Sequence, residues 1–534
     1  MREAKGQAGL WEGLEAPAEA RAEKAEGEKA KGKPRFQTID RTQIRMRVVN
    51  VDRLVEDDHD VRAIWEFVKG ADLSWYEEKV KAVEHEAGRP AVSPQVLVSL
   101  WVYAYSRGIS SAHEVARRCQ WEPAFQWLTG MEPVNYHTLS DFRVKHKEAL
   151  DQLFTDILGR LSAEGLVSVK RVMHDGVKIQ ANAGADTFRR EKTLQEHLEA
   201  ARQQVEAMAD PREETHARVA AARERAARER HQRLQRALEE RSKAQAAKAK
   251  EEDKAETRVS ETDPTCRMMK QGDGGYKPSY NAQITADGTP GRIITSAHLS
   301  QAASDYGEFI PALDQTHQRT GRMPEQGVTD GGFISRANIL AAQERGVQMI
   351  GPVDDGAAQG VGQLKRQGID PAFYPEAFRY EAESDQYVCP TGKVLRYKGK
   401  ERREGITLYF YRAEAEACAG CPEKPKCCPK KEGQGRRVTR RQEDEAIQQW
   451  RAKMETDEAK AIYQQRGAIS EFVNLWLKEK IGLRRFRVRG LVKATMELLW
   501  ACLTHNIQQW IRLRWRAKRT GTRTAEGACA LRAA

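Results

Sequence analysis

The sequence predicts an α/β protein in which a mixed β-sheet is flanked by helices and preceded by an all-helical domain. Apolar and polar residues alternate over 171–183 and again over 263–299, as they do in half-buried strands. Residues 326–351 follow a strand–helix–strand order, which implies a parallel pair of strands. Most of the remaining chain has the apolar spacing of helices. At 534 residues, the protein is long enough for about three domains.

The composition favours a polyanionic partner. The chain carries a net charge of +12, and 31% of its residues are charged. Such a basic excess points first to nucleic acid. Residues 1–33 contain no apolar segment typical of a signal peptide. The longest largely apolar run, 96–105, is about half the length of a membrane span. We therefore expect a soluble cytoplasmic protein that does not contact a membrane.

The N-terminal third is expected to be a charged tail followed by a helical domain. Residues 1–36 are rich in Ala, Glu and Lys, which predicts disorder. Over 37–169 the pattern is helical, and Ser93-Pro94 begins a strongly apolar helix that ends at Gly108. We expect this domain to bind DNA as a helix-turn-helix unit. The periodicity alone is equally consistent with helices that only pack together.

Asp175 stands inside the strand predicted over 171–183. Strands disfavour Asp, and a buried carboxylate costs several kcal/mol unless it is compensated. A functional role explains this placement. The alternative is a hairpin, because Asp175-Gly176 is also a strong two-residue turn signal.

Residues 188–258 are predicted to form an antiparallel helical hairpin inserted after this strand. A thin apolar stripe through Leu194 and Leu198 marks the first helix, and the second is rich in Arg and Ala. The hairpin is either a solvated charged spacer or a surface whose Arg rows lie along a DNA backbone.

Asp330 occupies a second distinctive position, where a short strand ends in glycines just before a helix over 336–345. The carboxyl ends of strands are where α/β sheets place their chemistry. A helix N-cap is the structural alternative.

Residues 354–442 are rich in Gly, Pro and Lys and contain most of the cysteines. The spacing Cys418-x2-Cys421-x5-Cys427, with Cys389 upstream, fits a zinc knuckle built from four thiolates. Cys428 is an alternative fourth ligand, and reduced structural thiols are the alternative to a metal site.

Residues 443–515 are predicted to be helical, and 516–534 to be a basic flexible tail. Glu471 and Lys478 are two turns apart on one helix face, and Arg466 lies further round it. A solvated surface position is the simpler explanation for Glu471. A basic loop and an Arg-rich end of the helical segment follow, both suited to phosphate contacts. The loop arginines are Arg484, Arg485, Arg487 and Arg489.

Three carboxylates, Asp175, Asp330 and Glu471, could converge only through the fold. Close carboxylates repel one another, so their convergence would require divalent cations. Oxygen ligands suit Mg²⁺ or Mn²⁺, and a two-metal site would clamp the entering and leaving oxygens of a phosphodiester. The other acids considered for this role are Asp186, Asp305, Asp355 and Glu479.

Several motifs resemble bacterial insertion-sequence transposases of the DDE type, which have an RNase H-like core. They are HDGVKIQANA over 174–183, GVTDGGFIS over 327–335, Y-x2-R over 463–466 and E-x6-K over 471–478. Segments 89–94, 103–111 and 137–143 resemble the helical N-terminal domain of the same group. The cysteine segment and 482–490 resemble its larger members, so the resemblance covers about residues 40–515.

The resemblance implies roles for individual residues. Asp175, Asp330 and Glu471 would be the catalytic metal ligands, and Tyr463, Arg466 and Lys478 would hold transposon-end DNA. Four residues separate Arg466 from Glu471, where the commonest form of the signature has three. The RNase H-like core would comprise 170–187, 259–353 and 443–515, interrupted by the two inserts.

The expected function is that of a DNA transposase associated with the bacterial nucleoid when bound to DNA. It would bind terminal inverted repeats, cleave DNA with Mg²⁺ or Mn²⁺, and transfer the 3′-OH ends to target DNA. A homodimer is expected, because two transposon ends must be brought together. The alternatives are an RNase H-like nuclease without strand transfer and a non-catalytic DNA-binding protein derived from a transposase.

Overall fold

The computed structural model divides into two compact units, Met1–Val49 and Asn50–Ala534. The helical domain, the sheets and the inserts all belong to the second unit. The predicted tail over 1–36 and the end of the chain from 520 lie outside the described residues. The structure describes residues 42, 44, 46, 48–80, 82, 90–208, 217–353, 362–403, 406–429, 433–442 and 445–519.

A helical domain begins the second unit. Its helix α3 is wrapped by the others, and most of its side chains are buried, from Leu97 to Tyr105. Pro94 occupies the first turn, where its missing N–H costs nothing. The Trp101 indole donates a hydrogen bond to the carbonyl of Leu139 at 3.1 Å, which ties α3 to α6. The elements are η2 Val51–Leu54, α1 Asp60–Lys69, α2 Ser74–Glu77, α3 Pro94–Ser106, α4 Ala112–Arg118, α5 Pro123–Thr129, α6 Tyr136–Lys145 and α7 Lys147–Ala163.

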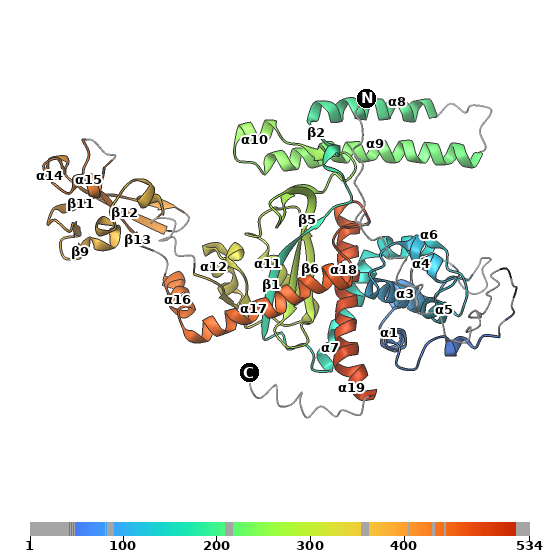
Figure 1. Cartoon of the computed structure of the whole chain (residues 1–534). Coiled ribbons are helices and arrows are strands. Elements are labelled where there is room, and N and C mark those ends of the chain that lie inside the picture. The colour runs from blue at the N-terminus through green and yellow to red at the C-terminus, as the bar shows by residue number, and fades with distance from the viewer. Residues whose placement is uncertain are drawn as a thin grey trace, which may run out of the picture. The chain divides into compact units, whose positions relative to one another are not determined.

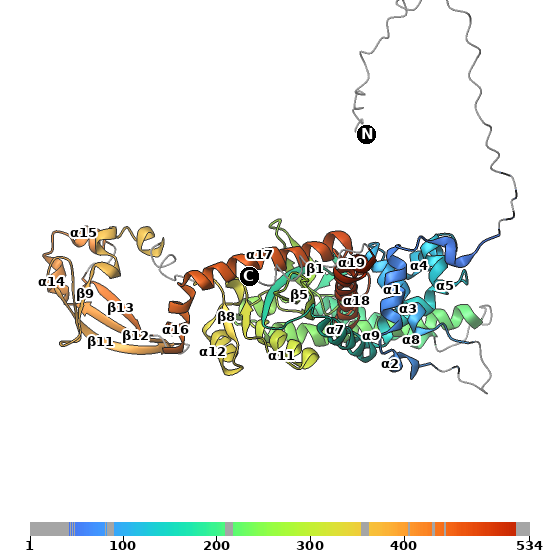
Figure 2. The ribbon, with the colours of Figure 1, turned by 90° about the horizontal axis from the view of Figure 1, so that it is seen from below.

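A six-stranded mixed sheet follows, and it confirms the predicted fold class. Strand β5 pairs antiparallel with β1, β4 and β6, while β1, β7 and β8 run parallel to one another. Helix α17 packs on β1 and β7, whereas α11 and α12 cover β6 and β8 (Figure 2). The strands are β1 Arg171–Gln180, β4 Arg267–Lys270, β5 Tyr276–Asp287, β6 Ile294–Ser300, β7 Gln326–Val328 and β8 Gln348–Ile350. The two crossover helices are α11 Phe309–Thr320 and α12 Arg336–Glu344.

A helical pair is inserted between β1 and β5. Helices α8 (Glu191–Met208) and α9 (Ala217–Ala246) lie side by side (Figure 1) and bury a narrow seam that includes Leu194 and Leu234. The short helix α10 (Glu251–Ala255) follows. At the base of the pair, the two-residue strands β2 Phe188–Arg189 and β3 Val259–Ser260 close the insert.

The cysteine-bearing segment contains more regular structure than its composition predicts. Five strands form an antiparallel sheet in the order β13-β12-β11-β10-β9. Its core is small and is centred on Leu395 and Tyr411. The elements are β9 Arg379–Glu381, β10 Gln386–Val388, β11 Val394–Arg403, β12 Ile406–Ala413, α14 Ala415–Ala419, α15 Lys424–Cys427 and β13 Arg437–Gln442.

The C-terminal helices complete the core. Helix α18 is buried along most of its length and packs against α3, α7 and β6. No helix among the residues that the structure describes is long and apolar enough to cross a membrane. The helices are α16 Glu445–Met454, α17 Asp457–Leu475, the π-helical turn η7 Trp476–Lys480, α18 Leu491–Trp510, the π-helical turn η8 Ile511–Trp515 and α19 Arg516–Arg519.

Asn506 joins α18 to the edge of the sheet. The ladder between β5 and β6 shifts register between Thr285 and Ala286. Beside this shift, Asn506 Oδ1 accepts from the Ile294 N–H at 2.8 Å, and Nδ2 donates to the Ile294 carbonyl at 2.9 Å. One buried amide therefore satisfies both backbone groups of Ile294.

We predict that Asn506→Leu destabilises the protein by about 2–4 kcal/mol, because two buried backbone groups lose their partners. The free energy of unfolding from chemical denaturation measures the effect. Lys493→Ala, at an exposed position of the same helix, is the control and should change it by less than about 0.5 kcal/mol. Equal stabilities of the two variants would contradict this role for Asn506.

Candidate active site

Asp175 stands in β1, and Asp330 follows the end of the neighbouring parallel strand β7. The register pairs Arg171 with Gln326 and Met173 with Val328, where β7 ends. Asp175 and Asp330 each come two residues after the last pair, and the Asp330 charge acts on Asp175. Level residues of adjacent strands project to the same face, and such strands are about 4.8 Å apart. The fold therefore brings together two of the three predicted acids.

Glycine at 176 allows close packing here and does not form a turn, since β1 continues through it to Gln180. A Cβ atom at this position would lie 2.5 Å from Asp305 Oδ1 and 2.8 Å from Gln283 Nε2. The hairpin alternative for Asp175-Gly176 is thus excluded.

Asp305 lies behind the pair, on the opposite face of the sheet. Its Oδ1 accepts hydrogen bonds from Asn281 at 2.7 Å and Gln283 at 2.8 Å, and it pairs with Lys178 at 3.0 Å. Burial opposes ionisation, but these hydrogen bonds and the Lys178 ammonium hold the pKa of Asp305 below its usual value. These hydrogen bonds and the ion pair satisfy the Asp305 carboxylate, and its side chain packs against Gly176.

The Asp175 carboxylate faces helix α17 and is 17% exposed. Asn474 Nδ2 donates to its Oδ2 at 2.9 Å, and Arg466 Nη1 lies 3.7 Å from the same oxygen. Burial raises the pKa of Asp175 to about 6; the Arg466 charge lowers it, and the nearby Asp330 raises it further. Asp175 and Asp330 are therefore close enough to repel each other.

Asp330 also acts as an N-cap, which was the structural alternative to a functional role. Its Oδ1 accepts the Gly332 N–H at 2.9 Å and caps the short 3₁₀ turn η4 (Gly331–Phe333). The cap fixes the carboxylate at the end of β7. The neighbouring Thr329 hydroxyl is buried and has no hydrogen-bond partner among the described residues.

Polar atoms on α17 are left unpaired beside Asp175. Asn474 Oδ1, Ser470 Oγ and Arg466 Nη1 are buried and make no hydrogen bond with any described residue. Buried polar atoms normally find partners, so these positions are suited to a bound ion, water or substrate.

Glu471, the third predicted acid, lies at the edge of this face and is not joined to the pair. It precedes Asn474 by three residues, which places it about 60° away around the helix. Its side chain is exposed and folds back toward Gly467, where a Cβ would lie 3.3 Å from Oε1. Among the described residues, no three His, Cys, Asp or Glu side chains are arranged to hold a metal ion as they stand.

Two of the predicted DNA-contacting residues, Arg466 and Lys478, lie near Asp175. Arg466 lies over the ring of Tyr463, which packs against the core. Burial and the charge of Arg484 lower the pKa of Lys478, while the Asp175 carboxylate acts in the opposite direction. Lys478 therefore sits between the acid site and the basic loop.

The basic loop is attached directly to the end of β1. Gln180 forms a bridge with Arg485, and its backbone bonds Arg484 and Phe486. Phe486 is buried, whereas all four loop arginines are exposed. Arg484 also pairs with Glu479, and Arg489 bonds the carbonyl of Asn182.

The basic end of the helical segment packs against the helical domain. Trp515 is buried, Arg514 bonds the Glu164 carbonyl at 2.7 Å and Arg516 pairs with Asp60 at 2.6 Å. These groups attach α19 to the helical domain, the Arg516 side chain is still 57% exposed, and phosphate contacts by this segment stay a prediction.

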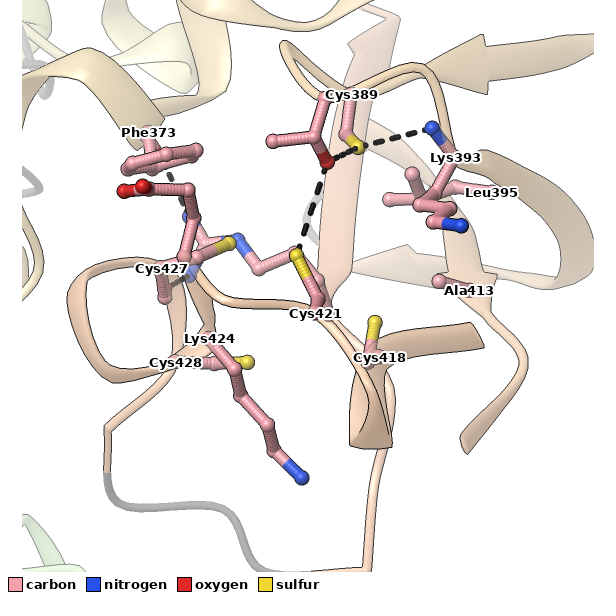
Figure 3. A pocket seen from close by; sticks show the side chains of 13 residues that line it. Phe373, Cys389, Lys393, Leu395, Ala413, Cys418, Cys421, Lys424, Cys427 and Cys428 are labelled. Carbon is pink, nitrogen blue, oxygen red and sulfur yellow. Dashed lines mark hydrogen bonds between the residues drawn. The ribbon is translucent and has the colours of Figure 1, made fainter. Parts of the chain in front are cut away.

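The predicted zinc ligands lie apart from the acid site, in the five-stranded unit. Cys389, Cys418, Cys421 and Cys427 line one pocket together with Cys428 (Figure 3).

Two segments of the chain match known family models. Residues 49–145 match a family model described as Transposase domain (DUF772), and residues 388–511 match one described as Transposase DDE domain. No curated protein matches the chain significantly. Both models describe transposases. Together the two matches support a DDE-type insertion-sequence transposase, an enzyme that acts on DNA.

The matched segments contain Glu471, Lys478 and the cysteines, whereas Asp175 and Asp330 lie between them. Sequence reasoning missed Asn474 and the Lys178–Asp305 pair. Helical spacing offered a signal for Asn474, which lies eight residues after Arg466 and hence on a similar face. Nothing in the sequence linked Lys178 to Asp305.

We predict that Asp175→Asn stabilises the metal-free protein by about 1–3 kcal/mol above pH 6, since it removes a buried charge beside Asp330. Because the pKa of Asp175 is raised from 3.8 to about 6, the folded state binds more protons than the unfolded state between these values. The free energy of unfolding of the wild type therefore falls as the pH rises through this window. Above the window, the ionised Asp175 continues to destabilise the folded state.

Denaturation in the presence of a chelator at pH 4 and pH 8 tests this prediction. The gain should be present at pH 8 and small at pH 4. Asp314→Asn, an exposed aspartate paired with Arg345, is the control and should give no gain. A variant no more stable than wild type at pH 8 would show that the Asp175 charge is fully compensated.

Proposed function

We propose that this transposase cleaves DNA at the ends of its mobile element and joins the freed 3′-OH ends to target DNA, with Asp175 and Asp330 at the reaction centre. The observation that supports the proposal is the parallel pairing of β1 with β7, which ends two residues before Asp175 and Asp330, together with the interaction between these two charges. The antiparallel part of the sheet, formed by β1, β4, β5 and β6 and extended by the parallel strands β7 and β8, supports an RNase H-like core.

The oxygen donors at this site fit a hard divalent cation. Asp175 has a raised pKa beside Asp330, and the Asn474 oxygen is buried without a partner among the described residues. Carboxylate and amide oxygens are ligands that Mg²⁺ and Mn²⁺ prefer. Asp175, Asp330 and Glu471 would hold the ions. When bound, a pair of such ions polarises the phosphodiester and activates the attacking hydroxyl.

The surrounding side chains would position the reacting groups. Asn474 fixes one oxygen of Asp175 and leaves the other directed by the Gly176 N–H at 3.0 Å. Arg466 lies beside the same carboxylate and would meet the scissile phosphate. Glu471 would complete the site by swinging from its position over Gly467, a rotation that an exposed side chain can make at low cost.

The DNA end would approach across the C-terminal end of β1. Lys478, Arg484, Arg485, Arg487 and Arg489 would contact its phosphates, and Tyr463 would help to hold Arg466. The helical domain is proposed to recognise the inverted repeat. A homodimer would hold two transposon ends together.

We predict that Asp330→Asn lowers cleavage of transposon-end DNA by at least about 100-fold while leaving end binding nearly unchanged, because phosphate contacts survive loss of a metal ligand. Single-turnover cleavage and a mobility-shift titration measure the two effects. Asp314→Asn is the matched control. Cleavage at the wild-type rate would show that Asp330 is not part of the centre.

A pre-cleaved end separates the proposed reaction from hydrolysis alone. Transfer of its 3′-OH to target DNA in Mg²⁺ would support the transposase reaction, whereas cleavage without joined product would identify a nuclease. DNA binding that ignores chelators, with no cleavage at all, would identify a non-catalytic binding protein.

We predict that Arg485→Ala weakens DNA binding about equally for different sequences and reduces the slope of log K against log salt by about 1, as expected for one lost phosphate contact. Affinity measured at several salt concentrations tests this. Arg345→Ala, at a half-buried arginine of the opposite sheet face that pairs with Asp314, should leave the slope unchanged. An unchanged slope for Arg485→Ala would remove the loop from the contact surface.

A further inference from the structure

Five of the nine cysteines in the chain gather in one pocket of the five-stranded unit (Figure 3). They come from three separate segments that the sheet brings together. Cys389 follows β10, Cys418 lies in α14 with Cys421 just beyond it, and Cys427 and Cys428 end α15. No disulfide joins any of the cysteines that the structure describes. The fold thus brings five free thiols into one pocket.

The backbone around Cys389 is shaped to support a thiolate. The Lys393 N–H donates to Cys389 Sγ at 3.2 Å across a tight turn in which Gly392 has φ 81°. The Thr391 hydroxyl lies 3.1 Å from Cys389 Sγ and 3.9 Å from Cys421 Sγ. Such donors commonly orient the thiolate ligands of a metal.

Arg436 is independent evidence that the pocket is suited to negatively charged groups such as thiolates. The residue is buried, and its Nη atoms donate to the carbonyls of Cys427 at 3.2 Å and Phe373 at 3.0 Å. Its Nε has no hydrogen-bond partner among the described residues. The guanidinium also lies over the Phe378 ring, and no carboxylate among the described residues pairs with it. Lys393 and Lys424 add positive charge to the pocket wall, and Glu423 adds one negative charge.

The apolar core of the unit is small for the sheet it supports. Six buried side chains form it, and one of them is Cys418. Small units with little core generally depend on a disulfide or a metal for stability. Because disulfides are absent among the described cysteines, a metal is the remaining source of cross-linking.

We propose that Cys389, Cys418, Cys421 and Cys427 bind one structural Zn²⁺ ion that holds the five-stranded unit together. Soft thiolates select zinc, and four of them satisfy its tetrahedral preference. Four thiolates and one Zn²⁺ carry a net charge of −2, which Arg436 and the two lysines offset. The site shares no ligand with the acid site at Asp175 and does not depend on the proposed reaction.

Cys427 is preferred over Cys428 as the fourth ligand. Both thiols line the pocket, and Figure 3 shows the Cys427 sulfur on the side toward Cys389 and Cys421, whereas the Cys428 sulfur lies further from them. The sulfurs line the pocket wall and do not yet surround one point. Binding would therefore require side-chain rotations, with one proton released from each thiol.

Zinc content of the full-length protein, measured by mass spectrometry after purification without added metal, tests the proposal. One zinc per chain is expected in wild type, in Cys428→Ser and in Asp330→Asn. Cys421→Ser and Cys427→Ser should lose it. Replacement by Co²⁺ should give the visible bands of a tetrahedral tetrathiolate site in wild type, Cys428→Ser and Asp330→Asn, but not in the other two variants.

The contrary outcomes are distinct. Wild-type protein that holds no zinc, even after refolding with Zn²⁺, would overturn the site. Zinc retained by Cys427→Ser but lost from Cys428→Ser would overturn the ligand assignment. Circular dichroism of each variant shows whether the remaining fold survives. Zinc loss in Asp330→Asn would place the ion at the acid site and contradict the proposal.

Discussion

The parallel pairing of β1 with β7 is the constraint on which the proposed reaction centre depends. It brings Asp175 and Asp330 near each other, and the Asp330 charge helps to raise the pKa of Asp175. A fold gains nothing in stability from such a pair, so its presence is better explained by a ligand that needs both charges. The rest of the structure supports this arrangement. Asp305 fills the opposite face behind Gly176, and α17 closes over the near face with Asn474 and Arg466.

The basic loop and the acid pair are built on the same strand. Because Gln180 of β1 bridges to Arg485, the loop arginines are fixed relative to Asp175 through backbone hydrogen bonds. A protein that presents a phosphodiester to two carboxylates needs a fixed distance between its phosphate-binding residues and those carboxylates. Helix α18 then joins these parts to the helical domain, since it packs against α3 as well as β6.

Much of the fold could be predicted from local pattern. The structure confirms three predicted features: the apolar helix after Ser93, the strand through Asp175 and the strand–helix–strand order around Asp330. The five-stranded sheet could not be predicted, because strands such as Val394–Arg403 carry charged residues in place of apolar alternation. The burial of Trp515 was missed for a related reason, since its Arg-rich neighbours suggest a solvated surface while tertiary contacts decide otherwise.

At the candidate site, the sequence identified the two aspartates that meet, and their roles remain predictions. It did not identify their partners, because the contacts of Asn474 and Asp305 join segments hundreds or dozens of residues apart. For Glu471, helical spacing predicts the face but not the rotamer, and the rotamer decides whether a carboxylate reaches its neighbours.

The two-residue ladder between β2 and β3 has an evolutionary consequence. The chain leaves for the helical pair at Phe188 and returns at Ser260, directly across from its departure. An insertion whose two ends are adjacent can change in length or sequence with little disturbance to the sheet from which it projects. Related enzymes are therefore free to carry arms of different lengths at this point on the same scaffold.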